Sequence, residues 1–526
     1  MLHRTASRTI KLWVGLAVLV AAAPVAWILI DRERPTNAGP SIEAVETAEA
    51  APETVRDFCS KCHAYPPPDC FPRSAWRQEL RQAYDFVKNS ALPGGYPSLE
   101  SVHRFYETRA PLEFTIPAPV RSTRQPPISF TPFPVTCPLA GGKPYPGTTF
   151  VDLVHLTDPH KTDLLLCDAW SGQVMTCDPN RPVDSWKLLA KLTAPARAAV
   201  VDLDRDGILD VIVADLGYLL PTNAKFGQVV WLRGKADGSY DPIVLAEGLG
   251  RVADVQAEDF RGNGKLDLVV AAFGGRTTGE TLLLENHTTD WSKPQFSPRV
   301  LDDRHGGIHV SVCDLNGDRK PDFVALITQE HETVVAFINK GNGEFAKETI
   351  YSAPHPAFGC SGIQIVDLNK DGRLDVLLTN GDSLDPPVLL KPFHGVRWLE
   401  NRGGFPFTEH FLGAMPGVMR ALAADVDGDG DRDIVAVSYL SSTTFSEAAI
   451  GKLDSIVLFE QTLPGSFEWH AIETGRHEHM TCTLGDWKGD DKMRLITGTF
   501  GMPDEAGNRP AFTIWEPGPR RNAGNQ

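Results

Sequence analysis

The strongest chemical motif in the sequence is Cys59-Ser60-Lys61-Cys62-His63, a C-x-x-C-H. Its two thiols can each form a thioether to one vinyl group of a haem, and the adjacent histidine then becomes a ligand of the iron. A thioredoxin-like pair would need a βαβ setting, and a zinc site would need more ligands than Cys70 supplies. A chance match is the remaining alternative. The motif indicates one covalent c-type haem, held by Cys59, Cys62 and His63.

The second axial ligand of this iron is harder to assign, because no methionine lies between residues 51 and 115. His103 is the only other histidine in that stretch. As the distal ligand it would give bis-histidine iron, which lowers the reduction potential relative to Met/His ligation. Alternatively, His103 is an ordinary surface histidine on a helix. Lys88, a ligand from elsewhere in the chain, or an open position are the other options.

Short helices are expected to position the motif. A helix over residues 53–64 would carry it and would end at the run of three prolines that follows. Ser74 is a good N-cap for a second helix through residue 89, and Ser98 for a third through residue 108.

A second set of residues that could bind a ligand recurs along the rest of the chain. Seven segments share an acidic loop, and their ninth positions fall at intervals of 47 to 61 residues. Side chains at positions 1, 3, 5 and 9 can surround one cation with the oxygen ligands that Ca²⁺ prefers. The complete sets are Asp202, Asp204, Asp206 and Asp210; Asp314, Asn316, Asp318 and Asp322; Asp367, Asn369, Asp371 and Asp375; and Asp425, Asp427, Asp429 and Asp433. They predict about four structural calcium ions, with solvated turn aspartates as the alternative.

Two of the recurring loops depart from this pattern. Arg261 stands at position 3 of the third loop, which leaves calcium binding there undecided. Lys488 and Arg494 stand at positions 3 and 9 of the seventh loop, where we expect cations in place of the metal. An EF-hand is excluded, because position 12 lies in an apolar strand instead of supplying a glutamate.

The repeats also predict the architecture. Each unit contains a strand, the acidic loop, an apolar strand, a Gly-rich turn and further strands, without a helix between them. Gly and Pro make up 46 and 41 of the 526 residues, which suits many turns and short strands. Seven four-stranded units predict a mainly β fold, a seven-bladed β-propeller, because an open β-solenoid usually has shorter repeats.

The D-x-D-x-D-G-x-x-D loops and the (L/I)VVA strands resemble FG-GAP repeats, also called VCBS repeats, of integrin-type propellers. The resemblance covers residues 145–510 and implies a calcium-stabilised propeller. The front segment resembles the C-x-x-C-H domain, a small helical cytochrome c-like unit, that precedes such propellers in some bacterial membrane-anchored proteins.

An apolar stretch near the N-terminus indicates where the chain resides. Residues 12–30 carry no charge and are long enough for one transmembrane helix, and Arg4, Arg8 and Lys11 precede them. The positive-inside rule then predicts a single-pass anchor in the inner (cytoplasmic) membrane with the bulk of the chain periplasmic, where covalent haem is attached. A cleavable signal peptide is the alternative, but Pro24 follows the small residues where cleavage would occur.

These features divide the chain into five segments. We expect a cytoplasmic tip and transmembrane anchor over residues 1–34, a flexible linker over 35–52, the haem domain over 53–110, a Pro-rich linker over 111–138 and the propeller over 139–520.

A further cluster is expected near the mouth of the propeller channel, where the innermost strands begin. Its members are Arg197, Arg251, Arg304, His305, His309, Cys360, Met419, Arg420, His477, Glu478, His479 and Met480. They could bind an anion or a metal, or dock the haem domain with His477, His479 or Met480 as a distal ligand. The alternative is that a wet channel simply collects polar residues.

The leading functional prediction is electron transfer through a single haem to a redox partner protein at the membrane, with the propeller as docking platform. A binding or adhesion module for protein or glycan with the haem as sensor is the alternative, as is a haem-coupled oxidoreductase, so an enzymatic role stays open. The net charge of −16 argues against nucleic acid as a partner. The sequence leaves the oligomeric state undetermined.

Overall fold

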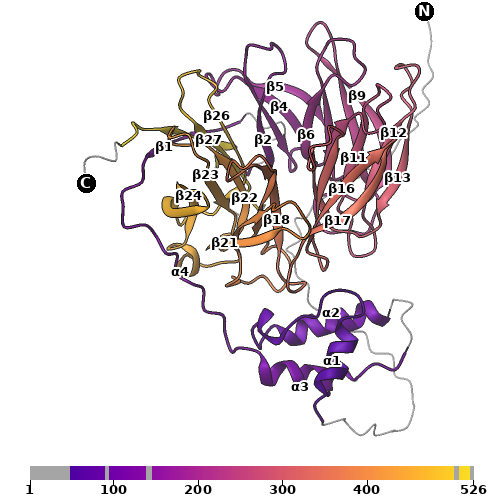
Figure 1. The fold of residues 1–526 in the computed structure, drawn as a ribbon, viewed down its shortest axis with the longest axis vertical. Coiled ribbons are helices and arrows are strands. Elements are labelled where there is room, and N and C mark those ends of the chain that lie inside the picture. Colours follow the sequence, from indigo (N-terminus) through magenta and orange to yellow (C-terminus); the bar gives the residue numbers. More distant parts are fainter. Residues whose placement is uncertain (1–47, 89–93, 138–144, 503–508, 522–526) are drawn as a thin grey trace, which may run out of the picture. The chain divides into compact units, whose positions relative to one another are not determined.

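The computed structural model describes residues 48–88, 94–137, 145–502 and 509–521, which lie in one compact unit spanning residues 47–526 (Figure 1). The predicted transmembrane helix over residues 12–30 falls outside the described residues. Among the helices that the structure does describe, none is long and apolar enough to cross a membrane.

Three α-helices and one short 3₁₀ helix form the front of the described chain. They are α1 (Pro52–Cys59), the 3₁₀ helix η1 (Pro68–Cys70), α2 (Trp76–Lys88) and α3 (Leu99–Arg109). The Ser98 side chain caps α3 by accepting from the backbone N–H of Ser101, as expected of an N-cap. The first helix is shorter than the expected 53–64: it ends at Cys59, so the C-x-x-C-H motif follows the helix in a turn.

Aromatic packing holds these helices together. Trp76 and Tyr106 are fully buried and stack with ring centroids 3.6 Å apart, and Val55 and Val102 complete the contact between the helices. Leu389, which belongs to a loop of the β-sheet region, also packs against this cluster. The helical core is therefore continuous with the rest of the unit.

The remaining described residues form seven four-stranded antiparallel sheets. Blades 1 to 4 consist of β2 (Thr148–Val154), β3 (Asp163–Asp168), β4 (Gln173–Cys177), β5 (Lys187–Lys191); β6 (Pro195–Val201), β7 (Asp210–Asp215), β8 (Gly227–Gly234), β9 (Tyr240–Leu249); β10 (Val252–Glu258), β11 (Asp267–Ala272), β12 (Glu280–Asn286), β13 (Phe296–Asp302); and β14 (Gly307–Cys313), β15 (Asp322–Ile327), β16 (Thr333–Gly341), β17 (Glu344–Ser352). Blades 5 to 7 consist of β18 (Cys360–Val366), β19 (Asp375–Asn380), β20 (Gly395–Glu400), β21 (Thr408–Ala414); β22 (Val418–Ala424), β23 (Asp433–Ser438), β24 (Asp454–Leu463), β25 (Ser466–Thr474); and β26 (His479–Gly485), β27 (Arg494–Thr499), β28 (Phe512–Pro517) with β1 (Phe130–Val135). A short helix, α4 (Glu447–Ile450), lies between β23 and β24.

The seven sheets close into a ring. The innermost strand of each blade contacts the innermost strand of the next, and β26 of blade 7 returns to β2 of blade 1. The second strand of every blade is buried along its whole length, which explains the apolar runs after the acidic loops. The prediction of a mainly β, seven-bladed propeller is confirmed.

The last blade is completed by a strand from the other end of the propeller sequence. β1 pairs antiparallel with β28, with Phe130 opposite Pro517 and Val135 opposite Phe512. The segment expected to be a Pro-rich linker over residues 111–138 therefore contributes a strand. Pro132 and Pro134 are compatible with this place, because β1 is an edge strand and proline is tolerated at a sheet edge.

The chain just ahead of β1 is also fixed, along the outer strand of blade 6. Arg121 Nε donates to Asp454 Oδ2 at 2.9 Å, and the backbone N–H of Ser122 donates to the Trp469 carbonyl at 2.8 Å.

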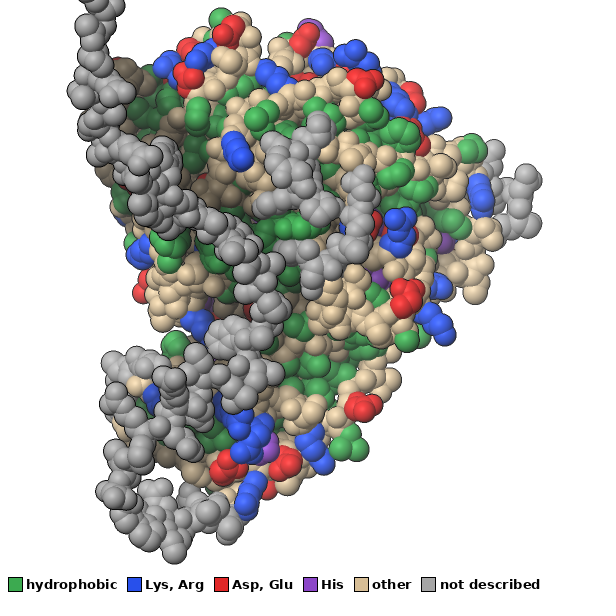
Figure 2. Space-filling view, turned by 180° about the vertical axis from the view of Figure 1, so that it is seen from behind, with side chains coloured by type: hydrophobic (Ala, Val, Ile, Leu, Met, Phe, Trp, Pro, Cys, Tyr) green, Lys and Arg blue, Asp and Glu red, His purple; other side chains and the backbone are tan. Residues whose placement is uncertain are grey.

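The propeller surface mixes charges of both signs. On the face drawn in Figure 2, Lys and Arg side chains lie interspersed with Asp and Glu rather than gathered in one patch. Such mixing, together with a net charge well away from zero, favours solubility.

Closure of the ring by β1 and β28 gives a first testable prediction. Phe512 is fully buried between Val135 and Trp186, so Phe512→Ala should lower the free energy of unfolding by about 3–5 kcal/mol. Phe133 lies on the same ladder but is 49% exposed, and Phe133→Ala should cost less than about 1 kcal/mol. Urea unfolding followed by tryptophan fluorescence measures both. Equal losses would contradict a closure that depends on buried packing.

Candidate functional site

The C-x-x-C-H motif lies where α1 ends. Cys59 is the last residue of the helix and is half-buried, while Cys62 is exposed and His63 is half-buried in the following turn. The Tyr106 hydroxyl donates to the Cys59 sulfur at 3.5 Å. Burial raises the pKa of the Cys59 thiol, and this outweighs the opposing effect of the Tyr106 hydrogen bond. Both cysteines are free thiols.

The orientation of the His63 ring is set by a backbone carbonyl. His63 Nδ1 lies 2.8 Å from the Ala64 oxygen. A carbonyl can only accept a hydrogen bond, so this contact assigns the proton to Nδ1 and leaves the lone pair on Nε2 free. That is the tautomer in which histidine binds a metal through Nε2 while its other nitrogen is held by the protein.

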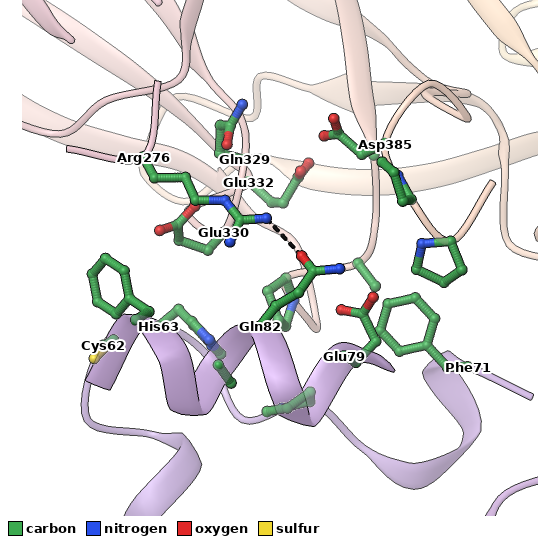
Figure 3. A pocket seen from close by; sticks show the side chains of 18 of the residues that line it. Cys62, His63, Phe71, Glu79, Gln82, Arg276, Gln329, Glu330, Glu332 and Asp385 are labelled. Atoms are coloured by element: carbon green, nitrogen blue, oxygen red, sulfur yellow. Dashed lines mark hydrogen bonds between the residues drawn. The ribbon is translucent and has the colours of Figure 1, made fainter. Parts of the chain in front are cut away.

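The motif opens into a cavity of about 530 Å³ (Figure 3). One wall comes from the helices and includes Cys59, Cys62, His63, Phe71 and Trp76. The other wall comes from propeller loops that join second to third strands or one blade to the next. The acidic loops join first to second strands, so strand alternation puts them at the opposite end of the sheets from the cavity.

Three cations belong to the propeller wall. Arg251 is 7% exposed and donates from Nε to the Gly274 carbonyl, Lys391 is 8% exposed and donates to the Ala357 carbonyl, and Arg276 donates to Gln82 Oε1 on α2 at 2.6 Å. Among the described residues, none of the three has a carboxylate within 4.0 Å. Burial lowers the pKa of Arg251 to about 10, which still leaves it charged at neutral pH.

The same cavity holds carboxyl groups that burial shifts towards the neutral form. Glu332 is 4% exposed, accepts from the backbone N–H of Cys360 at 2.7 Å, and has its pKa raised to about 8 by burial. Burial also raises the pKa of Glu79 to about 7, and Glu79 Oε1 is buried without a hydrogen-bond partner in the described structure. Burial and the charge of Asp385 raise the pKa of Asp382 to about 6.

The loop that carries Glu332 has an unusual backbone. Gln329 and Glu332 adopt left-handed conformations with φ of 59° and 44°, which non-glycine residues rarely do. Between them, Glu330 pairs with His305 at 3.0 Å. Burial alone would raise the pKa of Glu330, but the hydrogen bond and charge of His305 lower it to about 2. The loop therefore presents one firmly ionised carboxylate and one neutral carboxyl group to the cavity.

The structure does not bring the expected distal ligands to this cavity. His103 lies on α3, where its Nδ1 is 3.9 Å from Glu107 Oε2, and it is not among the cavity-lining residues. His477 is held by Ser438 and by the Ile450 carbonyl, and His479 Nε2 lies 2.7 Å from a Glu473 oxygen. Neither of these two lines the cavity, nor does Met480.

Sequence reasoning selected Arg251 but missed the other propeller residues of the cavity. Arg276, Glu332 and Lys391 lie in loops that carry no recurring motif. One signal was available in the sequence, the length of a loop. The loop between β19 and β20 has 14 residues, and Lys391 is one of them.

Members of the expected channel-mouth cluster lie in two places. Arg251 lines the cavity described above, and a second group lies on the innermost strands. Arg197 and His309 project from the innermost strands, where both contact Asp254, at 3.3 Å and 3.4 Å. Burial is the main cause that lowers the pKa of His309 to about 4, so this histidine is neutral at pH 7. Within this group, the charge of Arg197 is paired with that of Asp254, and His309 adds a neutral contact.

The acidic loops bring three carboxylates together at two of the four expected sites. One oxygen from each of Asp202, Asp204 and Asp206 lies within 4.8 Å of the others, and Asp425, Asp427 and Asp433 form a similar group. Arg233 from the neighbouring strand reaches Asp204 at 2.5 Å.

The loop of the expected site in blade 4 has an amide at position 3. Asn316 Oδ1 accepts from the backbone N–H of Asp318 at 2.9 Å, and Asp204 and Asp427 accept the equivalent bond in blades 2 and 6. Asp314 accepts from the same N–H at 3.0 Å, and Asp318 pairs with Lys320 at 3.0 Å. Among the described residues, the loop does not gather three carboxylates as blades 2 and 6 do. Calcium binding by Asp314, Asn316, Asp318 and Asp322 stays a prediction.

The loop of the expected site in blade 5 also has an amide at position 3. The Asn369 amide donates to Asp371 Oδ2 at 3.1 Å, and its Oδ1 accepts from the backbone N–H of Asp371 at 3.1 Å. Asp371 also pairs with the Arg373 guanidinium, which supplies a positive charge from within the loop. Asp367 accepts from the backbone N–H groups of Asp371 and Gly372. Calcium binding by Asp367, Asn369, Asp371 and Asp375 stays a prediction.

The carboxylate at position 9 has a role of its own. Asp210 accepts from the backbone N–H of Leu203 at 3.0 Å and of Gly234 at 2.7 Å, so it ties its loop to the third strand of the blade. The same two bonds recur for the other ninth-position aspartates, Asp322, Asp375 and Asp433. These residues are fully buried, and this backbone role explains much of their recurrence across the repeats.

Guanidinium groups occupy the two loops that depart from the sequence pattern. Arg261 makes a bidentate contact with Asp267, at 2.9 Å from both Nε and one terminal nitrogen. Arg494 contacts Asp490 through two nitrogens, each at 2.7 Å, and Lys488 pairs with Glu516 at 2.7 Å. A side-chain cation thus neutralises each of these loops internally.

Residues 202–270 and 314–378 match the model of the FG-GAP-like repeat. The chain carries FG-GAP-like repeats. Their loops and following strands are those of blades 2, 3, 4 and 5 described above. None of the curated proteins is similar enough in sequence to match the chain.

Two solved structures illustrate what the propeller is similar to. One is BBS1N in complex with ARL6DN, at 12% identity and a TM-score of 0.42, covering 78% of this chain and 99% of that chain. The other is an inactive virginiamycin B lyase from Staphylococcus aureus with quinupristin, at 10% identity and a TM-score of 0.45, covering 74% of this chain and 99% of that chain.

The internal cation of blade 3 gives a second prediction. Asp267 is fully buried, so Arg261→Met would leave its carboxylate without a counter-charge and should lower the free energy of unfolding by about 3–5 kcal/mol. Arg402→Met is the control, because Arg402 also pairs with a carboxylate but is 60% exposed, and its loss should cost at most about 1 kcal/mol. Adding Asp267→Asn to Arg261→Met should recover part of the loss. Chemical unfolding that ranks the control as the more damaging variant would refute this interpretation.

Proposed function

We propose that this chain is a c-type haem protein that transfers single electrons, with the haem bound to Cys59, Cys62 and His63. The observation that carries the proposal is the state of His63. Its Nδ1 faces the Ala64 carbonyl and its Nε2 is left free, next to two free thiols at the edge of one cavity.

The cavity suits a haem in size and in lining. Ligand pockets for molecules of this class span about 300–1,000 Å³ and are mainly apolar with a few polar groups. The volume of about 530 Å³ and the apolar wall of Phe58, Phe71, Trp76 and Leu80 meet both conditions. The haem would supply the one-electron chemistry, while these side chains exclude water and set its surroundings.

The proposal does not retain His103 as distal ligand. Its position beside Glu107, away from the cavity, favours the alternative of an ordinary histidine on a helix. A role for His103 would require α3 to be rearranged, and Val102, Phe105 and Tyr106 on the same helix are buried in the helical core.

We assign the propeller the role of docking platform for a redox partner protein. Propellers with FG-GAP-like repeats are suited to binding, because their loops present a broad surface on a rigid ring. Next to the cavity, the loop between β7 and β8 exposes Tyr218, Leu220 and Phe226, at 47%, 46% and 61%. Its Pro221 and Asn223 line the cavity itself. An apolar patch beside the redox centre is where an electron-transfer partner would bind.

The proposed setting is periplasmic, with the segment of residues 12–30 as the membrane anchor. Covalent haem attachment takes place on that side of the membrane, which agrees with the orientation that the basic residues before the segment predict.

We further propose that calcium stabilises blades 2 and 6 and, by their matching residues, blades 4 and 5. The carboxylate groups of Asp202, Asp204 and Asp206 and of Asp425, Asp427 and Asp433 support this, because each group can offer three oxygens to one ion. The guanidinium groups in blades 3 and 7 support it indirectly, since a cation occupies the equivalent loops there. Support is weaker for blades 4 and 5, whose described loops do not bring three carboxylates together.

Haem attachment is the direct test of the proposed function. The chain matured together with a haem-attachment system should retain haem through denaturing electrophoresis, and Cys59→Ala with Cys62→Ala should abolish that signal. The folded propeller should survive in the double variant. His103→Ala should leave the absorption spectrum of both redox states unchanged. A wild-type chain without covalent haem, or haem retained by the double variant, would sink the proposal.

Calcium binding is tested through stability. Chelation should lower the melting temperature, because an ion that binds only the folded state at 100 times its dissociation constant adds about 2.7 kcal/mol per site. Asp429→Ala should reduce the calcium stoichiometry by one, whereas Lys488→Ala, in the loop with internal cations, should leave it unchanged. A melting temperature that ignores both chelator and added calcium would contradict the proposal.

A further inference from the structure

We infer that the propeller completes the haem site. Arg276 and Lys391 bind the two propionate carboxylates of the haem, and Arg251 adds a positive charge to the same wall of the cavity. The inference rests on the proposed function and extends it from the helices to the other wall of the cavity. It makes the propeller part of the cofactor site as well as a docking platform.

The cavity lies between the helices and the propeller loops. Cys59, Cys62 and His63 lie on its helical wall, so a haem attached there occupies the space that faces the propeller (Figure 3). Leu389 and Ala357 of the propeller pack directly against the helical core. Arg276 reaches across to Gln82 on α2, as the dashed line in Figure 3 shows. The two walls are therefore joined by apolar contacts and by a polar bond at the cavity itself.

Charge pairing differs among the arginines of this chain. Arg261 and Arg494 meet carboxylates, whereas the half-buried Arg420 donates to the Ile363 carbonyl. Arg251 and Lys391 are more than nine-tenths buried, yet their polar bonds go to backbone carbonyls. A carbonyl satisfies the hydrogen bond but brings no full negative charge to the cation, and the carboxylate of Asp385, which acts on Arg251, makes no ion pair with it.

Burial weakens the negative charge of two acids in the cavity. Glu79 and Glu332 are held near neutrality by burial, with pKa values raised to about 7 and about 8. Glu330 is ionised, but it is paired with His305. Asp382 and Asp385 lie on the same wall, and a pKa raised to about 6 leaves Asp382 ionised at neutral pH. Glu79 and Glu332 thus offer the cations less negative charge than ordinary carboxylates would, whereas a haem brings two carboxylates.

A purely structural role for the cations is the competing explanation. In that case Arg251 and Lys391 would only brace the loops whose carbonyls they contact. Arg276 separates the two explanations, because it is exposed and its described bond goes to the other wall of the cavity rather than to its own loop. Removing its charge should not disturb the fold.

The experiment uses the full chain with haem attached in cells. Arg276→Gln removes the charge but keeps an amide that can still bond Gln82, and Lys391→Met removes the charge and keeps the bulk. Lys265→Met is the matched control: its ammonium also donates to a backbone carbonyl, that of Thr288, but it lies at the acidic-loop end of blade 3. Resonance Raman spectra report the propionate bending modes, and a redox titration gives the midpoint potential of each protein.

Both cavity variants should shift the propionate bending bands, and the control should not. Each should also lower the midpoint potential, because a nearby cation favours the reduced haem; the expected change is about tenfold in the reduction equilibrium, or 59 mV for one electron. Propionate bands that stay at the wild-type position in both cavity variants would overturn the inference while leaving the covalent haem, and so the proposed function, intact. A chain that attaches no haem would overturn both.

Discussion

The propeller depends on one antiparallel ladder, in which β1 closes blade 7 by pairing with β28. Each of the other blades is continuous in sequence. Blade 7 instead pairs Phe130, near the start of the propeller sequence, with Pro517, near its end. Without this ladder, β28 would be an unpaired edge, and the junction of blade 7 with blade 1 would rest mainly on the contacts of β2 with β26 and β27.

The blades themselves could be predicted from the sequence because their signal is local. Asp210 and its counterparts in blades 4, 5 and 6 begin a buried strand and bind two backbone N–H groups, so the same residue type recurs in these blades. The closing strand and the cavity carry no such signal. β1 contains two prolines, which are typical of a linker, and Arg276 and Lys391 meet the C-x-x-C-H motif only because loops of different blades converge at one end. Residues that come together from distant loops leave no periodic pattern in the sequence.

The two ends of the propeller differ in how they handle charge. At the acidic-loop end, carboxylates are grouped in blades 2 and 6, and arginines such as Arg233, Arg261 and Arg494 pair with the loop carboxylates. At the cavity end, three cations lie on the propeller wall, and burial raises the pKa of Glu79 and Glu332 to about 7 and about 8. Grouped carboxylates therefore lie at one end of the propeller, and cations without a bound carboxylate in the described structure lie at the other. The groups that stabilise the fold are thus separate from those that would hold a redox cofactor.

The ties between the chain ahead of β1 and blade 6 have a mechanical consequence. A pull on the helices is transmitted along residues 111–129 and reaches Arg121, Ser122 and Arg124 before it reaches β1. Arg121 is bound to Asp454, and Arg124 is bound to Glu460 and Glu468, all on blade 6. These ion pairs bear the load first, so tension is transferred to the body of one blade while the ladder that closes the ring stays unstressed.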